Sequence, residues 1–371
     1  MSRPELGPVL AGCTIVVTAD RRANDLAAAL GRRGADVRHA AALSMIPTWD
    51  DDELRAATER LVARPPDVVV VTTGIGFRAW LEAADAHGLA GRLTAVLSST
   101  RLIARGPKAR GAIQAAGLTP DWVTESETSA EITEVLTREG VAGLRIAVQL
   151  HGAGADGLDA ALAAAGAEVV LLAVYRWGPS PDPRALEDSA HAAASGDVDA
   201  VVFTSAPGAE AWLSTAERLP TWEAVEARYA SGDLVAAAVG EVTAGPLRAR
   251  GITPLIPDRG RLGALIRGLV AHFSPPSPRA AATIAGPLEV RSGGAVLSGE
   301  LVPLTSGGRE LLRLLIAHGG RTVDRAALLE ALPAATSAHA AEVAIARLRE
   351  ALAAPGLIST VVKRGYTLEM A

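Results

Sequence analysis

Up to residue 273 the hydrophobic pattern consists mainly of short apolar runs, each followed by small or polar residues and then by helical spacing. One such segment occurs twice. Residues 67–80, DVVVVTTGIGFRAW, return as residues 199–212, DAVVFTSAPGAEAW, 132 positions further along (199 − 67). Each copy predicts a buried strand, a turn with Thr or Ser, and a helix. A repeat of this length indicates a duplicated structural unit.

The duplication extends beyond these two copies. Residues 14–19 and 36–43 predict strands on either side of a helix over 23–33, and the same order returns from residue 145. In a further matched pair, each copy places a glycine, Gly106 or Gly240, between a strand and a helix. The pattern therefore predicts two similar α/β lobes with ligand groups at the carboxyl ends of parallel strands.

The pattern changes after residues 274–282, a Pro- and Ser-rich segment that predicts a linker. The expected elements that follow are strands at 288–290, 295–297 and 301–303, helices at 309–317, 324–332 and 337–352, and strands at 358–362 and 366–369. The last two strands alternate like a hairpin that turns at residues 363–365. Three helices closed by a hairpin predict a winged helix.

Composition narrows the possible classes of protein. The 371 residues are 49% hydrophobic and 21% charged, which suits two or three well-filled domains. The net charge of −5 restricts any nucleic-acid site to a local patch. The single cysteine, Cys13, excludes an intrachain disulfide and a thiolate zinc cluster. No apolar run has the length of a signal peptide or membrane span, so we expect a cytoplasmic protein without a membrane partner.

The glycine turns are candidate anion sites, because a helix that follows such a turn points its first backbone N–H groups at the ligand. The alternative is a tight turn without a ligand.

Residues 152–157 fit G-x-G-x-x-G, but the repeat copy of this segment has no glycine, which disfavours dinucleotide binding. The seven histidines lack metal-ligand spacing, so no metal site is expected.

Residues 283–371 resemble the winged-helix effector domain of OmpR/PhoB-type regulators, through LTSGGRELLRLLIAHGG, VDRAALLEAL, AEVAIARLREAL and ISTVVKRGYTL. The resemblance implies binding to double-stranded DNA, with the third helix in the major groove and the hairpin at the minor groove. By this resemblance, the residues expected to contact DNA are Arg347, Arg349, Thr360, Lys363 and Arg364. The alternative for any single arginine is a solvated helix face. The core positions of the third helix would be Ala341, Ile345, Leu348 and Leu352.

Two departures from that family weaken the expected DNA affinity. Glu350 and Ala351 stand where basic residues are usual, and Val362 replaces a frequent wing arginine. Residues 283–371 contain 9 Lys and Arg against 8 Asp and Glu, a net charge of +1. Dimerisation or a second transcription regulator on the DNA is therefore plausible.

The winged helix raises the possibility of a phosphoacceptor receiver in front of it, but Asp51 and Asp52 follow no strand and Lys108 lies in a Gly-Pro turn. The duplicated region instead resembles uroporphyrinogen-III synthase, through VVFTSAPGAEAW, AAAVGEVTAGPL and AVYRW. The resemblance implies two parallel-sheet α/β lobes joined by two strands, at 45–49 and 172–177. The implied domains are 1–45 with 178–273 for lobe 1, 46–177 for lobe 2, the linker 274–282 and the winged helix 283–371.

The synthase family cyclises hydroxymethylbilane, a tetrapyrrole with eight carboxylates, and uses no cofactor. Tyr175 matches a tyrosine proposed to assist departure of the hydroxyl group; the alternative is a tyrosine that packs at the hinge between the lobes. The implied ligand-binding residues are Arg21, Arg22, Thr72, Thr73, Gly106, Lys108, Thr204, Ser205, Gly240 and Thr243. The Thr and Ser residues have the alternative role of helix caps. Glu241, Val242 and Ala109 depart from the family pattern, which suggests weakened or absent catalysis.

The favoured hypothesis is a transcription regulator whose synthase-like half senses a tetrapyrrole-like ligand or docks a partner. Such fusions resemble actinobacterial regulators of nitrate and nitrite assimilation, with sirohaem as the link. Closing the cleft would reorient the winged helix through residues 274–282. The competing hypotheses are an active synthase with an appended DNA-binding domain, and a two-lobed sensor of an unrelated metabolite.

Overall fold

The computed structural model describes residues 8–47, 52–150, 152, 154, 156–275, 277–332 and 337–371. The chain forms two compact units, Met1–Leu43 with Ser180–Ala371, and Ser44–Pro179. The first unit contains lobe 1 and the winged helix, and the second contains lobe 2. None of the helices in the described ranges combines the length and apolar character that crossing a membrane requires.

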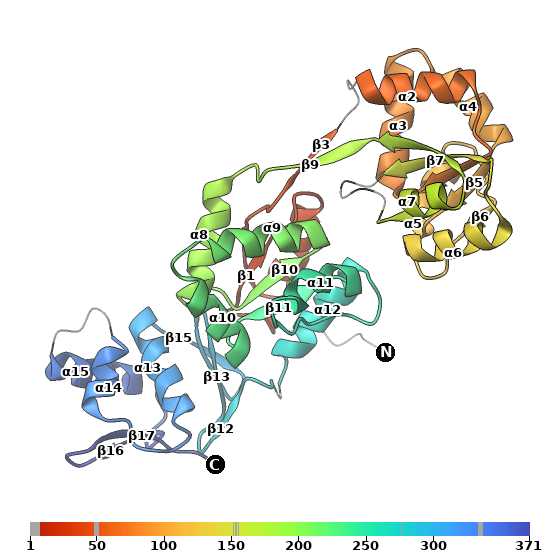
Figure 1. Ribbon diagram of the computed structural model, residues 1–371. Coiled ribbons are helices and arrows are strands. Elements are labelled where there is room, and N and C mark those ends of the chain that lie inside the picture. Colours follow the sequence, from red (N-terminus) through yellow and green to blue (C-terminus); the bar gives the residue numbers. More distant parts are fainter. Residues whose placement is uncertain are drawn as a thin grey trace, which may run out of the picture. The chain divides into compact units, whose positions relative to one another are not determined.

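Lobe 2 is built on a five-stranded parallel sheet in the order β6-β5-β4-β7-β8. The strands are β4 (Val68–Val71), β5 (Arg101–Ala104), β6 (Trp122–Val123), β7 (Arg145–Leu150) and β8 (Glu168–Ala173). The helices are α2 (Asp52–Ala63), α3 (Gly74–Ala86), α4 (Ala90–Ser99), α5 (Pro107–Ala115), α6 (Ser129–Glu139) and α7 (Leu158–Ala164). Helices cover both faces of this sheet (Figure 1). The central strand is therefore apolar at every position.

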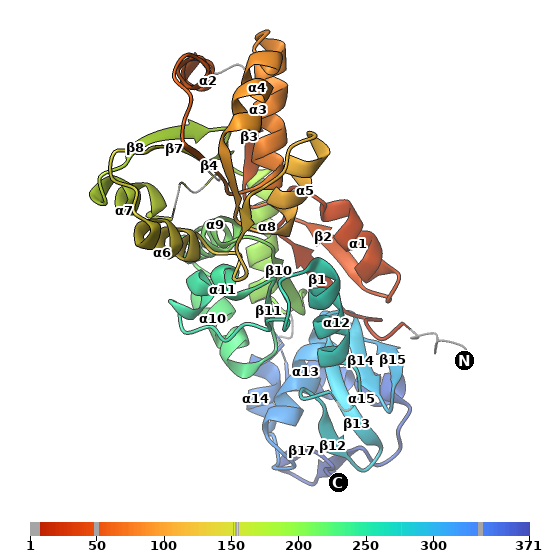
Figure 2. The same ribbon diagram turned by 90° about the vertical axis from the view of Figure 1, so that its right-hand side faces the viewer.

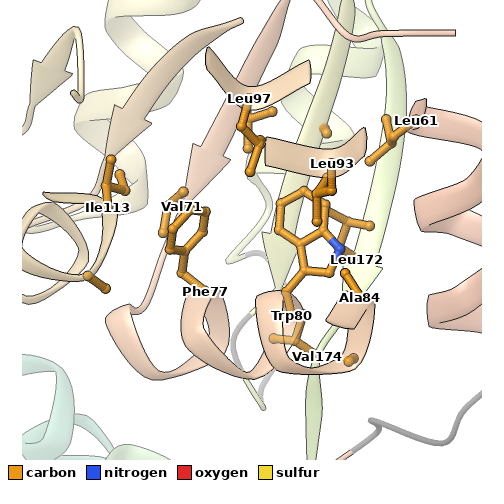
Figure 3. Close-up of a cluster of buried hydrophobic side chains, with 14 of the residues drawn as sticks. Leu61, Val71, Phe77, Trp80, Ala84, Leu93, Leu97, Ile113, Leu172 and Val174 are labelled. Carbon is orange, nitrogen blue, oxygen red and sulfur yellow. The ribbon is translucent and has the colours of Figure 1, made fainter. Parts of the chain in front are cut away.

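Alternate residues of β4 contribute to separate cores on the two faces of the sheet. Val69 and Val71 belong to the core around Trp80, and Val68 and Val70 to the core on the other face. Figure 3 shows Trp80 beside Leu93. The indole Nε1 of Trp80 donates to the hydroxyl of Thr58 on α2 at 2.9 Å, which satisfies its one buried donor.

Lobe 1 repeats this plan with a four-stranded parallel sheet in the order β11-β10-β1-β2. Its strands are β1 (Thr14–Val17), β2 (Asp36–His39), β10 (Ala200–Phe203) and β11 (Val235–Ala238). Its helices are α1 (Ala23–Gly31), α8 (Pro183–Ala194), α9 (Ala206–Glu217), α10 (Trp222–Ser231), α11 (Glu241–Arg248) and α12 (Leu262–Phe273). Trp212 is the counterpart of Trp80, and its Nε1 donates to Ser189 Oγ at 2.9 Å. The predicted duplication is confirmed in topology and in side-chain packing.

The predicted connecting strands are present, with different bounds. β3 (Ser44–Pro47) pairs antiparallel with β9 (Tyr175–Gly178), so that Ser44 faces Gly178 and Met45 faces Trp177. Trp49, placed in the first strand by the sequence, lies outside the described residues. The second predicted strand divides into the end of β8, which pairs with β7, and the start of β9, which pairs with β3; Val174 between them is buried in the lobe 2 core.

The C-terminal region has the predicted winged-helix order. Its elements are β12 (Ala281–Thr283), β13 (Gly286–Arg291), β14 (Gly294–Leu297), β15 (Glu300–Pro303), α13 (Ser306–Ala317), α14 (Arg325–Glu330), α15 (Ala338–Leu352), β16 (Ile358–Val361) and β17 (Gly365–Leu368). The first four strands form an antiparallel sheet, which Figure 2 shows beside α12 of lobe 1. The predicted core positions of α15 are buried: Ala341, Ile345, Leu348 and Leu352. The strand β12 was not predicted, because its Ala-Ala-Thr sequence carries no alternation.

Candidate functional site

The predicted hydroxyl donors of lobe 2 lie at the carboxyl end of β4. Thr72 is buried, and its hydroxyl donates to the carbonyl oxygen of Gln149 at 2.7 Å. Thr73 caps α3 by accepting the N–H of Gly76 at 3.1 Å. The buried Gln149 amide bonds Thr73 twice, at its backbone N–H (3.2 Å) and its hydroxyl (3.3 Å). These hydroxyls hold the strand-to-helix turn, and their role toward a ligand stays a prediction.

Lobe 1 places its predicted donors in the same way. Ser205 caps α9 by accepting the N–H of Gly208 at 3.2 Å, and Thr204 before it is half-buried. Arg21 and Arg22 are exposed at the start of α1. Arg22 has a left-handed backbone with φ 56°, and its Nε lies 3.1 Å from the carboxylate of the exposed Asp25. The two arginines therefore remain at the surface, where a carboxylate ligand can reach them.

The glycine turn of lobe 2 carries a carboxylate of the chain itself. Gly106 opens α5, and a Cβ built on it would lie 3.3 Å from Cγ and 3.4 Å from Oε2 of Glu127. The Glu127 carboxylate thus lies beside the helix N-terminus, which favours negative charge. Arg105, one residue before Gly106, pairs with Asp156 through Nη1 at 3.4 Å. Burial lowers the pKa of Arg105, whereas the negative charges of Asp156 and Glu127 act in the opposite direction.

The glycine turn of lobe 1 also carries an acidic residue. Gly240 opens α11, and Glu241 is the first residue of that helix, where it forms an ion pair with Arg248. Thr243 is 5% exposed, so its side chain faces the lobe core. Lys108 is exposed on α5 in lobe 2, and its carbonyl oxygen packs against Gly74. Each lobe therefore has a glutamate at the helix N-terminus where the sequence predicts that a polyanion binds.

Tyr175 lies in an aromatic and apolar setting. It is 7% exposed, belongs to the same core as Trp80, and meets Trp177 edge-on with ring centroids 5.8 Å apart. A Cβ at Gly152 would approach Tyr175 Cε2 to 2.7 Å and Trp177 Nε1 to 2.6 Å, so this glycine allows the loop to contact both rings. Ala153 and Ala155 of the G-x-G-x-x-G motif lie outside the described residues. The geometry is compatible with either role predicted for Tyr175.

The winged helix presents four of the five predicted DNA contacts on its surface, Thr360 on β16 among them. Arg347 on α15 is exposed, as are Lys363 and Arg364 in the turn between β16 and β17. Lys363 has a φ of 63°, and the N–H of Arg364 bonds the carbonyl of Val361 at 2.9 Å, which closes the tip of the hairpin. Val362 in the same turn is 78% exposed. The exposed cations are thus set on a helix and a hairpin, as DNA contact requires.

Arg349 and Thr360 bond each other. Arg349 donates from Nε to the carbonyl of Ile358 at 2.8 Å and from Nη2 to the Thr360 hydroxyl at 2.8 Å. Its guanidinium also lies over the ring of Tyr366, 5.3 Å from the centroid. These contacts tie α15 to the hairpin, a positioning role that the sequence pattern did not indicate. Whether either residue also contacts DNA stays a prediction.

Two charged residues near Gly106 were missed by sequence reasoning. Arg105 directly precedes the glycine, a signal that was available. Glu127 is 21 positions further along the chain, and only the fold brings it to this turn.

Across the described ranges, no group of three His, Cys, Asp or Glu side chains is arranged to hold a metal ion.

These lobes and their strand-end turns define a two-lobed α/β module joined to a DNA-binding domain of the winged-helix class. The family model of uroporphyrinogen-III synthase HemD matches residues 24–267, and the chain belongs to that family. A second model, transcriptional regulatory protein, C terminal, matches residues 299–368. This fusion of a synthase-like domain with an OmpR/PhoB-type domain supports a transcriptional regulator.

Three similar proteins illustrate the two halves. An uncharacterized protein of Bacillus subtilis, YjjA, is 32% identical over 208 residues, covering 56% of this chain and 76% of that protein. A mutant uroporphyrinogen III synthase from Thermus thermophilus is 29% identical with a TM-score of 0.55, covering 69% of this chain and 97% of that one. The DNA-binding domain of RstA from Klebsiella pneumoniae, crystallised with the RstA box, is 30% identical with a TM-score of 0.22, covering 24% and 97%.

Proposed function

We propose that this protein is a DNA-binding regulator of nitrogen assimilation, acting on nitrate or nitrite genes, whose synthase-like half senses a ligand or docks a partner. Its domains would be residues 1–45 with 178–273, 46–177, the linker 274–282 and the winged helix 283–371. The observation that carries DNA binding is the exposed set Arg347, Lys363 and Arg364 on a winged helix. The nitrogen assignment rests on the resemblance of such fusions to nitrate and nitrite regulators.

DNA binding is tested with a gel shift on promoter fragments of nitrite reductase and sirohaem genes from the same genome. We expect Arg347→Ala to weaken binding by roughly 1–3 kcal/mol if it contacts a base edge. Lys363→Ala should reduce the salt dependence of binding by about one phosphate contact. Arg321→Ala, an exposed arginine outside α15 and the hairpin, is the matched control. Equal affinity of all four proteins would reject these contacts, and binding to unrelated promoters alone would reject the nitrogen assignment.

In the synthase-like half, the proposed ligand is a tetrapyrrole-like polycarboxylate. Arg21, Arg22 and Lys108 would attract its carboxylates, because all three cations are exposed. Thr72, Thr73, Thr204, Ser205, Gly106, Gly240 and Thr243 would line the strand ends. A second transcription regulator remains the alternative partner of this half. Fluorescence titration with uroporphyrinogen III tests the ligand, and no binding at low salt would leave partner docking as the role.

An active synthase is the competing function, favoured by membership of the synthase family. Against it stand the glutamates Glu127 and Glu241, since they place negative charge where eight substrate carboxylates would approach. An assay of hydroxymethylbilane cyclisation separates the two functions. We expect no turnover above the uncatalysed rate. Robust turnover that falls with Tyr175→Phe would establish the enzyme instead.

A further inference from the structure

Asp67 and Asp199 occupy the same place in the two copies of the repeat, one residue before the central strand. Each carboxylate accepts the N–H of the residue that opens the neighbouring strand, Arg145 at 2.8 Å in lobe 2 and Thr14 at 2.9 Å in lobe 1. Each backbone N–H donates to the carbonyl of that same residue, at 2.8 and 2.9 Å. The shared task of the two aspartates is therefore to hold two strands together.

The two aspartates differ in their exposure to solvent. Asp67 is exposed, whereas Asp199 is 0% exposed. The winged-helix domain supplies the cover, because the N–H of Ser292, in the turn between β13 and β14, donates to both carboxylate oxygens at 3.1 and 3.0 Å. Arg279 Nη1 lies 3.6 Å from the same carboxylate. Asp199 has thus gained a second set of partners that Asp67 does not have.

A buried charged network surrounds this contact. The side chains of Arg279, Glu289 and Arg291 are 8%, 4% and 4% exposed. Arg291 donates to three backbone carbonyls of the lobe 1 segments, those of Val9, Ala11 and Phe273, at 2.7 to 2.9 Å. The guanidinium groups of Arg279 and Arg291 both lie over the Phe273 ring, 5.3 and 5.5 Å from its centroid. Residues from the linker, β13 and the end of α12 therefore share one buried cluster.

Backbone contacts also bring lobe 1 and the winged-helix domain close together. The N–H of Gly293 donates to the carbonyl of Gly12 at 2.8 Å, and a Cβ at Gly293 would lie only 3.0 Å from the Gly12 backbone. On α13, Arg309 Nη2 bonds Asp197 at 2.6 Å. Burial alone would raise the pKa of Asp197, but hydrogen bonds from Ser195 and Arg309 outweigh it and lower the pKa. The second contact is therefore also made with a charged carboxylate.

The docked domain still presents its DNA-binding residues. Asp199 lies at the amino end of β10, so the winged helix covers the strand edge opposite Thr204 and Ser205. Arg347, Lys363 and Arg364 remain exposed. The contact therefore blocks neither the candidate ligand edge of lobe 1 nor the recognition helix.

We propose that lobe 1 and the winged helix act as one DNA-binding body anchored on Asp199, and that residues 274–282 do not serve as a hinge. This rests on DNA binding by the winged helix as proposed above, and it replaces the expected reorientation through the linker. Within that linker Ser277 is buried and Arg279 lies inside the charged network. Because separating buried charges from their partners leaves them uncompensated, the network favours the docked arrangement over one in which the two domains have come apart. Regulatory motion then belongs to lobe 2.

The rate of cleavage by trypsin reports the docked state directly. To cut the Arg279–Ala280 bond, trypsin must bind the Arg279 side chain, which therefore has to leave the network. We expect the full chain to resist cleavage there while the exposed Arg259 is cut readily. Asp199→Asn keeps an oxygen for Thr14 but removes the charge that faces Arg279, and should release the fragment 280–371 at least ~10-fold faster, which corresponds to about 1.4 kcal/mol. Asp67→Asn is the matched control, and its cleavage after Arg279 should equal that of the natural protein.

A second variant guards against misfolding of lobe 1. The substitution Gly293→Leu, in the winged-helix domain, places a side chain against the Gly12 backbone. It should therefore speed cleavage after Arg279 and leave the circular dichroism spectrum unchanged. The proposal fails if the natural protein is cut after Arg279 as fast as after Arg259, or if neither variant changes the rate. The assay contains no DNA, so a negative gel shift does not affect its outcome, and failure here leaves DNA binding intact.

Discussion

At the scale of single residues, a glutamate lies beside each of the two glycine turns. Glu127 comes from a distant loop and Glu241 from the helix itself, yet both put a carboxylate at a helix N-terminus. The helix dipole that would attract a ligand anion is therefore already neutralised in part. A polycarboxylate can bind there only against this like charge.

We expect Glu127→Gln to tighten binding of uroporphyrinogen III at low salt by about 5-fold, because a like charge at ~4 Å costs about 1 kcal/mol in water. Glu125→Gln removes an equal charge two residues away and is the control. Fluorescence titration at two salt concentrations measures both, and the gain should shrink as salt rises. An equal gain in the two variants would show that only the net charge matters.

Local spacing made the helix caps among the candidate residues predictable, but contacts between elements were not predictable. Thr73 and Ser205 cap helices, the alternative role predicted for them, and their spacing to Gly76 and Gly208 already allowed this. The bonds of Arg349 to the hairpin were not predictable, since they join residues of α15 to strand β16. Residue type and local spacing determine caps, whereas cross-element contacts depend on the fold.

At the scale of elements, the two lobes share a contact that joins two consecutive helices, α2 and α3 in lobe 2 and α8 and α9 in lobe 1. The indole of Trp80 on α3 is held by Thr58 on α2, and that of Trp212 on α9 by Ser189 on α8. Both tryptophans are fully buried, so removing either hydroxyl leaves a buried N–H donor without its partner.

Thr58→Val should therefore destabilise lobe 2 by ~1–3 kcal/mol, and Ser189→Ala should do the same to lobe 1. Native-state hydrogen exchange measures this, through the amides of β4 for lobe 2 and of β10 for lobe 1. Thr133→Val removes a hydroxyl that donates to the Ser129 carbonyl within α6, and should change little. A loss of protection in both strands from one substitution would mean that the lobes unfold together.

The inner strands of the parallel sheets were predictable because each is a short, mostly apolar run, as in Val68–Val71. Two kinds of element were less accessible. The three-residue strand β12 has no pattern of its own, and the division of 172–177 into two strands depends on their pairing with different partners, β7 and β3. Boundaries set by tertiary packing are absent from local periodicity.

At the scale of the whole molecule, the repeat was visible in the sequence, but the attachment of the winged helix was not. The segment 274–282 has the composition of a flexible linker, yet Ser277 and Arg279 are buried. Asp199 looked like a simple copy of Asp67, because the residues that cover it, Arg279 and Ser292, lie 80 and 93 positions further along the chain (279 − 199 and 292 − 199). Composition describes how a segment behaves alone and cannot reveal a docking partner.

The chain leaves lobe 1 and returns to it at neighbouring residues. Ser44 N–H donates to the Pro179 carbonyl at 3.1 Å, and Ser180 Oγ donates to the Ala41 carbonyl at 2.6 Å. In evolutionary terms lobe 2 has the coincident ends of an inserted domain, of the kind that chains accept and lose without breaking the surrounding fold. Natural selection can thus exchange the segment between these two points while the fold of lobe 1 stays the same.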